Sequence, residues 1–178
     1  MANAPALRKE TIIRWLLAAL SVSLAIWVSI SIFRAFSSTS DQIKLVNYDE
    51  VAVKALDFVQ QGAERFFQMG VLVLGGIWTL AVVDKDQRLE LADTPELVMF
   101  GIATSLFLIE LYFLQQYGDI IQRVVWDVRT LPGEQGQRLF PDILRSPYID
   151  LHYGVIVKCF YSGLTVSGFT VLSLCRLR

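Results

Sequence analysis

The sequence predicts an all-α protein: a four-pass transmembrane helical bundle with two long helices that form a hairpin projecting from one side of the membrane. Four apolar segments carry this prediction, at 15–33, 66–83, 97–117 and 154–175. Each is about as long as the ~20 helical residues that cross a hydrocarbon core of ~30 Å. The composition agrees, because 54% of the 178 residues are hydrophobic and only 19% are charged. We therefore expect a single integral membrane domain, 1–178.

The first apolar segment follows a basic stretch that contains Arg8, Lys9 and Arg14, as in a secretory signal. Its apolar run is longer than that of a usual signal peptide, and residues 33–36 are a poor cleavage site. We interpret the segment as a retained anchor, with a cleaved signal as the alternative. With four crossings, the N-terminus, the 84–96 connection and the C-terminus share one side. Basic residues are denser there, which predicts that both termini are cytoplasmic.

Apolar residues at helical spacing continue beyond the second and third segments. This spacing predicts two long helices, 48–83 and 97–131, the second ended by Pro132, which cannot continue a helix. Their excess length falls on one side of the membrane, within the extramembrane segments 34–65 and 118–153. A helical stem therefore projects from the bilayer on that side.

The apolar stripes of this stem need something to cover them, and three arrangements are open. The two stripes cover each other as an antiparallel pair, they lie flat on the lipid surface, or they meet a protein partner or a second copy. Surface binding is disfavoured because neither polar face is rich in lysine or arginine. An interface would suit Phe58, Phe66 and Trp126. Beyond the stem, three prolines between 132 and 153 predict an irregular, ordered loop.

Glu110 and Lys158 are the charged residues inside the third and fourth apolar segments. A charge at the centre of a span costs ~2.5–3.5 kcal/mol on insertion scales. Because these segments run antiparallel, the two charges fall at comparable depth, and we predict an intramembrane ion pair that sets the register of the two helices. Two alternatives stay open. Lys158 reaches the interface while Glu110 is neutral or faces water, or Glu110 lines a polar path for ions or protons.

Small residues at helical spacing mark three of the apolar segments as packing faces. In lipid, helices associate where small side chains let their backbones approach closely. The candidate packing residues are Ser21, Ala25, Ser29, Gly70, Gly75, Gly76, Gly163, Ser167 and Gly168. Packing within one bundle is the default interpretation. More small faces than a monomer can bury would indicate self-association.

Motifs for catalysis or cofactor binding are absent from the sequence. It contains no His-Glu-x-x-His, no Gly-x-Ser-x-Gly and no glycine-rich phosphate loop. The only histidine is His152, and roughly 24 Å of predicted helix separates Cys159 from Cys175, so neither a metal site nor a disulfide is expected. No catalytic residue and no cofactor is predicted. The net charge of −1 gives no reason to expect nucleic acid.

These observations predict a non-enzymatic membrane protein that forms a homo-oligomeric, channel-like or pore-like assembly. Its partners would be the lipid bilayer and further copies of the chain. The alternative is a membrane sensor or scaffold subunit that recruits or regulates a partner protein through the stem or the 84–96 connection. A membrane enzyme is the least favoured hypothesis, because intramembrane carboxylate chemistry needs a second carboxylate in a span.

Overall fold

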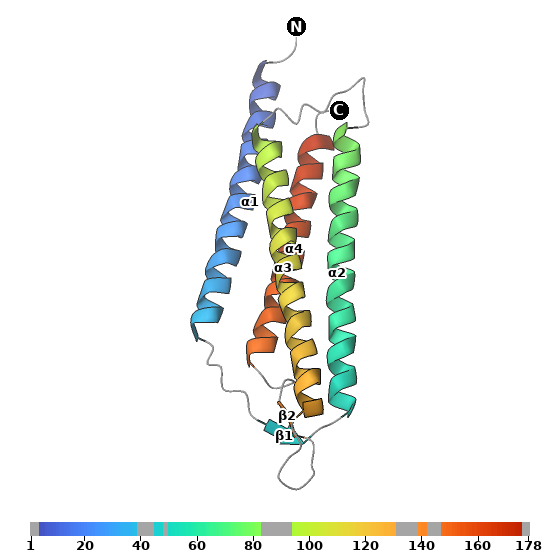
Figure 1. The fold of residues 1–178 in the computed structure, drawn as a ribbon. Helices are drawn as coiled ribbons and strands as arrows, with labels where there is room; N and C mark the ends of the chain where they lie inside the picture. The colour runs from blue at the N-terminus through green and yellow to red at the C-terminus, as the bar shows by residue number, and fades with distance from the viewer. Residues whose placement is uncertain are drawn as a thin grey trace.

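The computed structural model describes residues 4–38, 45–47, 50–82, 94–130, 139–141 and 147–175. These residues form four helices and two short strands (Figure 1). The helices are α1 (Ala4–Ser38), α2 (Glu50–Val82), α3 (Thr94–Thr130) and α4 (Pro147–Cys175), and the strands are β1 (Leu45–Asn47) and β2 (Leu139–Pro141). The predicted all-α architecture is confirmed, because each strand is only three residues long.

The centre of the bundle is the pair α3 and α4, with α1 and α2 on either side of it. Each outer helix packs against both central helices, while α1 and α2 make no contact with each other within the described residues. Successive helices run in opposite directions, so α1 begins and α4 ends at the same end of the bundle (Figure 1).

Three of the four helices are long and apolar enough to cross a membrane, over Lys9–Ser37, Pro95–Gln122 and Asp150–Leu174. These lengths indicate an integral membrane protein. In the part of the chain that the structure describes, α2 is not among them. The fourth crossing, 66–83, therefore stays a prediction.

The surface of α1 is that of a helix surrounded by lipid. Its large apolar side chains point outward, and Trp15, Leu20 and Trp27 are each about half exposed. The exposed hydroxyls of Ser23 and Ser29 donate to main-chain carbonyls one turn earlier, each at 2.9 Å. Because hydrocarbon holds no water to satisfy a hydroxyl, these bonds remove a desolvation cost.

Two apolar clusters hold the bundle together. The first lies between α1, α3 and α4 and includes the fully buried side chains of Val28, Met99 and Val166. The second joins α2 to α3 and α4 and includes Ala63 and Tyr117. Each outer helix is thus fixed to the central pair by its own part of the core.

The observed bounds of α2 and α3 match the predicted hairpin, 48–83 and 97–131, to within three residues at every end. At the end opposite the termini, both helices reach beyond α1 and α4 (Figure 1). Their apolar stripes cover each other, which is the first of the three predicted arrangements. Ala63 and Ile121 are buried in one cluster, and Val59 and Ile120 pack against it.

The aromatic residues predicted for an interface on the stem have different environments. Phe66 faces the bundle, where its ring lies 4.9 Å from that of Phe160 on α4. Phe58 is left 76% exposed. The side chain of Trp126 lies outside the described residues. Only Phe58 therefore remains available for an external partner among the two that the structure describes.

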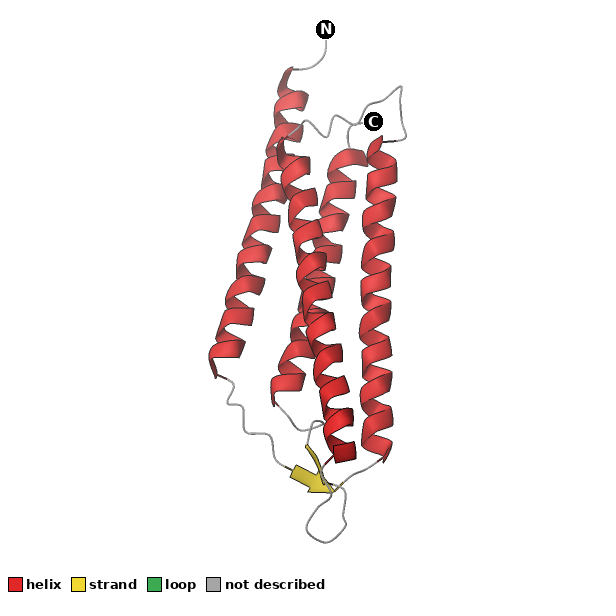
Figure 2. Cartoon of the chain, viewed as in Figure 1, coloured by secondary structure: helices red, strands yellow, loops and turns green. Residues whose placement is uncertain are grey.

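Two parts of the predicted extramembrane segments fold differently from expectation. β1 and β2 form a small antiparallel sheet, with Val46 opposite Phe140, below the ends of α2 and α3 (Figure 2). The irregular loop predicted for 132–153 is wrong over its last seven residues, 147–153, because α4 already begins at Pro147. Proline is tolerated in the first turn of a helix, where its missing N–H has no partner to lose.

Candidate functional site

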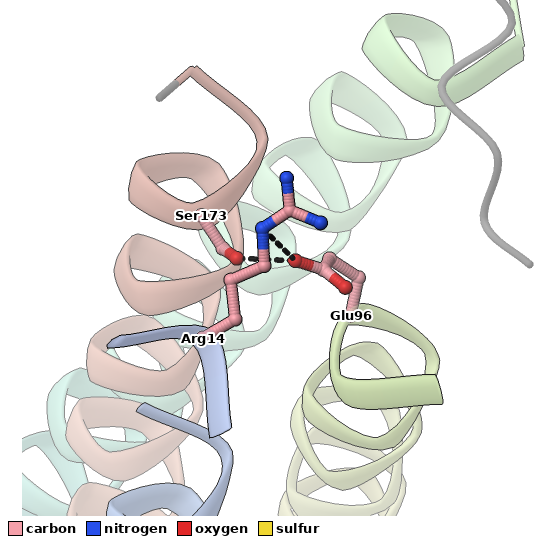
Figure 3. Close-up of polar contacts among 3 residues, drawn as sticks. All are labelled: Arg14, Glu96 and Ser173. Carbon is pink, nitrogen blue, oxygen red and sulfur yellow. Dashed lines mark hydrogen bonds and ion pairs between the residues drawn. The ribbon is translucent and has the colours of Figure 1, made fainter. Parts of the chain in front are cut away.

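A polar cluster joins three helices at the end of the bundle where α1 begins and α4 ends. Arg14 comes from α1, Glu96 from α3 and Ser173 from α4, and the three side chains converge (Figure 3). Glu96 is 1% exposed and Ser173 is 2% exposed, so the cluster is part of the interior.

The carboxylate of Glu96 is the centre of the cluster. Its Oε1 atom accepts a hydrogen bond from the Ser173 hydroxyl and lies 3.7 Å from Arg14 Nε. Its Oε2 atom is buried and has no hydrogen-bond partner in the described part of the chain. A buried carboxylate is costly unless it is paired and hydrogen-bonded, so Arg14 and Ser173 together make its position tenable.

The ends of the three helices place these residues. Glu96 lies in the first turn of α3, directly after Pro95, where a negative charge interacts favourably with the helix dipole. Arg14 directly precedes Trp15, the first residue of the apolar run in α1. Ser173 lies near the end of α4. All three therefore sit at the edge of an apolar segment on one side of the bundle.

Our sequence analysis did not single out this cluster. It treated Arg14 as part of a basic N-terminal stretch and Glu96 as the end of a polar connection. The signal was nevertheless present, because each charge borders an apolar segment on the same predicted side of the membrane. Opposite charges at matched depth on helices 1 and 3 were the pattern to look for.

Glu110 and Lys158 do not form the predicted ion pair. Glu110 is fully buried, and neither of its oxygens has a hydrogen-bond partner. Lys158 is on the exposed face of α4. The next residue, Cys159, is the buried one, and it lies close enough to Glu110 for an electrostatic interaction. One residue turns a helix by about 100°, which is enough to point the lysine away from its predicted partner.

Half of the candidate packing residues serve the interior of the monomer. Ser21 and Ser167 are buried, and Ala25 is half-buried. Gly70 and Gly163 lie on opposite sides of the Phe107 ring, where an added Cβ would come within 2.6 Å and 3.0 Å of ring atoms. These residues let α2 and α4 pack closely around one phenylalanine of α3.

The remaining candidates face outward. Ser29, Gly75, Gly76 and Gly168 are exposed, and a Cβ added at any of the three glycines would meet nothing within 4 Å. Gly75 and Gly76 are adjacent on α2 and lie on the side away from α3 and α4. The monomer therefore leaves some small residues without a packing role.

The outward face of α2 lies at the depth of the α3 span. A Cβ added at Gly118 would lie 3.6 Å from Gln60 Nε2, and the rings of Trp78 and Phe100 are 6.1 Å apart. Residues 60–78 of α2 consequently run beside 100–118 of α3, inside the Pro95–Gln122 segment.

This outward face is polar over much of that length. α2 is the most strongly amphipathic of the four helices. Its exposed polar residues, at helical spacing with Leu72 and Gly75, are Gln61, Glu64, Arg65, Gln68 and Thr79. The apolar face of α2 contacts the bundle, so the polar face points to whatever surrounds the protein.

The described residues hold no group of three or more His, Cys, Asp or Glu side chains that could bind a metal ion. Cys159 is a free, buried thiol. His152 lies in an aromatic contact instead, with its ring 5.5 Å from those of Phe36 and Phe113. This contact fastens α1 to α3 and α4 at the end opposite the polar cluster.

Comparison with models of known protein families, with curated proteins and with solved structures finds no match. What the chain does is therefore argued from its own geometry: the polar cluster, the buried Glu110 and the outward face of α2.

Proposed function

We propose that this chain is a non-enzymatic, four-pass membrane protein that assembles with further copies of itself into a channel-like oligomer. In this oligomer the outward face of α2 lines a polar path. The observation that carries the proposal is the exposure of Gln61, Arg65 and Gln68 at a depth where α3 is inside its apolar segment.

The direction of the helices supports four crossings. α1 and α3 start at the same end of the bundle, since Arg14 near the start of α1 meets Glu96 in the first turn of α3. When both of these apolar helices cross the bilayer, the chain between them has to return through it. The 33 residues of α2 extend over about 50 Å, more than the ~30 Å of a hydrocarbon core.

Exposed amides and charges are unstable against lipid. A glutamine side chain brings donors and an acceptor that hydrocarbon cannot satisfy, and a charged arginine at the centre of a span costs more. A water-filled path between copies would satisfy both kinds of group. Rings of polar and charged side chains are also how many channels discriminate between ions.

Small residues on the same helix support assembly through α2. At Gly75 and Gly76 the α2 backbone is open to the surroundings, so a helix of a second copy can approach it closely. The lipid-facing surface of α1, in contrast, is covered by large apolar side chains. In the proposed oligomer α2 faces the other copies and α1 faces the bilayer, with both termini in the cytoplasm because basic residues are denser on that side.

A second candidate function is that of a scaffold subunit that recruits a protein partner through the stem. Val51 and Phe58 favour it, because both lie on one side of α2 beyond the bundle and are 72% and 76% exposed. Apolar residues of this size outside the lipid are typical of interaction sites. Loss of partner capture, without loss of ion flux, on changing Phe58→Asp would distinguish this role from the channel.

Reconstitution with single cysteines tests the channel directly. In a background in which Cys159 is alanine and Cys175 is serine, cysteines at 61, 68 and 75 are placed on α2. A charged, membrane-impermeant thiol reagent is expected to label them and to change the ion conductance of the reconstituted vesicles. Cysteines at Val22 and Ile26, on the exposed face of α1, are the matched controls and should stay unlabelled in the bilayer.

Two results would contradict the proposal. One is a stable oligomer that carries no ion flux and whose α2 cysteines are as unreactive as the α1 controls. The other is a clean monomer in the bilayer, measured by mass in lipid nanodiscs.

A further inference from the structure

A cavity of about 250 Å³ lies between α1 and α4, next to the polar cluster. Its lining comes from two helices: Glu10, Ile13, Arg14 and Leu17 of α1, and Leu172 and Ser173 of α4. Two of these residues, Arg14 and Ser173, are the ones that contact Glu96. The cavity is thus built on a side-chain arrangement that is already fixed by a buried carboxylate.

The cavity lies at the level where lipid head groups meet the hydrocarbon core. Glu10 and Arg14 precede the apolar run that starts at Trp15, and Leu17 is the first cavity residue inside that run. Its polar side chains therefore face the head-group layer, while its aliphatic side chains continue toward the bilayer interior.

The charges of the lining fit a zwitterion better than an anion or a simple cation. The Arg14 guanidinium carries several N–H donors, of which Nε faces Glu96, and its terminal nitrogens extend past that carboxylate (Figure 3). Ser173 adds a hydroxyl on the opposite wall. Glu10, one helical turn before Arg14, supplies a carboxylate on the same face of α1.

We propose that this cavity binds the head of an ethanolamine-type phospholipid. The phosphate oxygens accept hydrogen bonds from Arg14, the ammonium donates to Glu10, and the start of the acyl chain packs against Leu17 and Leu172. A choline head lacks the N–H donors that Glu10 requires. A head with net negative charge is repelled by Glu10 and Glu96, two carboxylates against one guanidinium. This inference is independent of the proposed channel, since it concerns the opposite side of the bundle from α2.

Competition between lipids tests the proposal on the full-length protein. The chain is reconstituted in vesicles of equal parts phosphatidylethanolamine, phosphatidylcholine and phosphatidylglycerol, extracted in mild detergent, and analysed by native mass spectrometry for retained lipid. Retention of the ethanolamine lipid should exceed that of the choline lipid about tenfold, the ratio expected for one charge-assisted hydrogen bond.

Two variants and one control locate the site. Glu10→Gln should reduce the ethanolamine-to-choline ratio to about one, and Leu172→Trp should abolish retention by filling the cavity. Leu20→Trp, on the 53% exposed face of α1, should leave the ratio unchanged. Equal retention of the two lipids by the unmodified chain would overturn the proposal even if both variants failed to fold. Preferred retention of the glycerol lipid, or unchanged retention by Leu172→Trp, would overturn it as well.

Discussion

Two carboxylates of α3, Glu96 and Glu110, are equally buried but differ in what surrounds them. Glu96, at the start of the helix, has the Ser173 hydroxyl and the Arg14 guanidinium on one of its oxygens. Glu110, about four turns further along, has no hydrogen-bond partner for either oxygen. Burial in an apolar helix therefore does not by itself identify the residue that holds a bundle together. The partner does.

The difference follows from where each carboxylate sits along the helices. Charges are cheapest at the ends of membrane-spanning segments, and here the ends of α1, α3 and α4 bring three polar side chains to one level. In the middle of α3 the neighbouring helices present mainly apolar side chains, so Glu110 meets the thiol of Cys159 instead of a cation.

The largest effect is expected from Arg14→Ala. This change leaves the Glu96 carboxylate buried without its cation, and it should lower the free energy of unfolding in detergent micelles by about 3 kcal/mol, the low end for breaking a buried ion pair. The low end applies because the Arg14 side chain keeps 14% exposure. Lys9→Ala, at an exposed position of the same helix, is the control and should change stability little.

The double variant Arg14→Met/Glu96→Leu sharpens this result. Removing both charges leaves no uncompensated ion, so the double variant should be more stable than Arg14→Ala alone. If the two variants are equally unstable, the cost of Arg14→Ala comes from lost packing and the contrast between the two carboxylates fails.

Ser173→Ala should have the next largest effect, a loss of about 1 kcal/mol. The serine hydroxyl bonds a carboxylate across two helices, and interhelical hydrogen bonds in membranes are worth about this much. Thr165→Ala on the same helix is the matched control, because its exposed hydroxyl bonds only the carbonyl of Tyr161 one turn earlier. Equal losses for the two variants, measured by thermal unfolding in detergent, would argue against a special role for the cluster.

How much of this was predictable depends on which property of a helix is asked for. Helical spacing predicted the bounds of α2 and α3 to within three residues, because the 3.6-residue period and the proline after α3 are local signals. The pairing of β1 with β2 was not predicted, because three-residue strands separated by two long helices carry no local signal. Pro147 was misjudged as loop because a proline in a first turn resembles a helix breaker.

The candidate site shows the same division between depth and direction. Sequence position gave Glu110 and Lys158 comparable depth, but it did not give the rotation of α4, and the structure turns Cys159 rather than Lys158 toward α3. Arg14 and Glu96 also had matched depth in the sequence. Which pair of matched charges meets is decided by helix packing, which apolar side chains such as Phe107 control from several turns away.

Glu110→Met should raise the free energy of unfolding, by up to about 1 kcal/mol. The variant replaces a buried carboxyl that has no partner with an apolar side chain of similar size, a change that is often neutral or stabilising. The corresponding change at the other carboxylate, Glu96→Met, should be destabilising because it strands Arg14. A loss of more than about 1 kcal/mol for Glu110→Met would mean that Glu110 has a stabilising partner after all.

The smallest effect is expected from Lys158→Gln, whose result tests the comparison most strictly. Lys158 is exposed on α4 and makes no ion pair with Glu110, so the free energy of unfolding should change by less than about 0.5 kcal/mol. A double-mutant cycle with Glu110→Gln should give a coupling energy near zero, whereas a cycle of Arg14→Gln with Glu96→Gln should give a coupling of about 1 kcal/mol or more. A coupling of that size between Glu110 and Lys158 would restore the predicted intramembrane pair. It would also mean that both carboxylates of α3 are held by cations, which would remove the contrast between them.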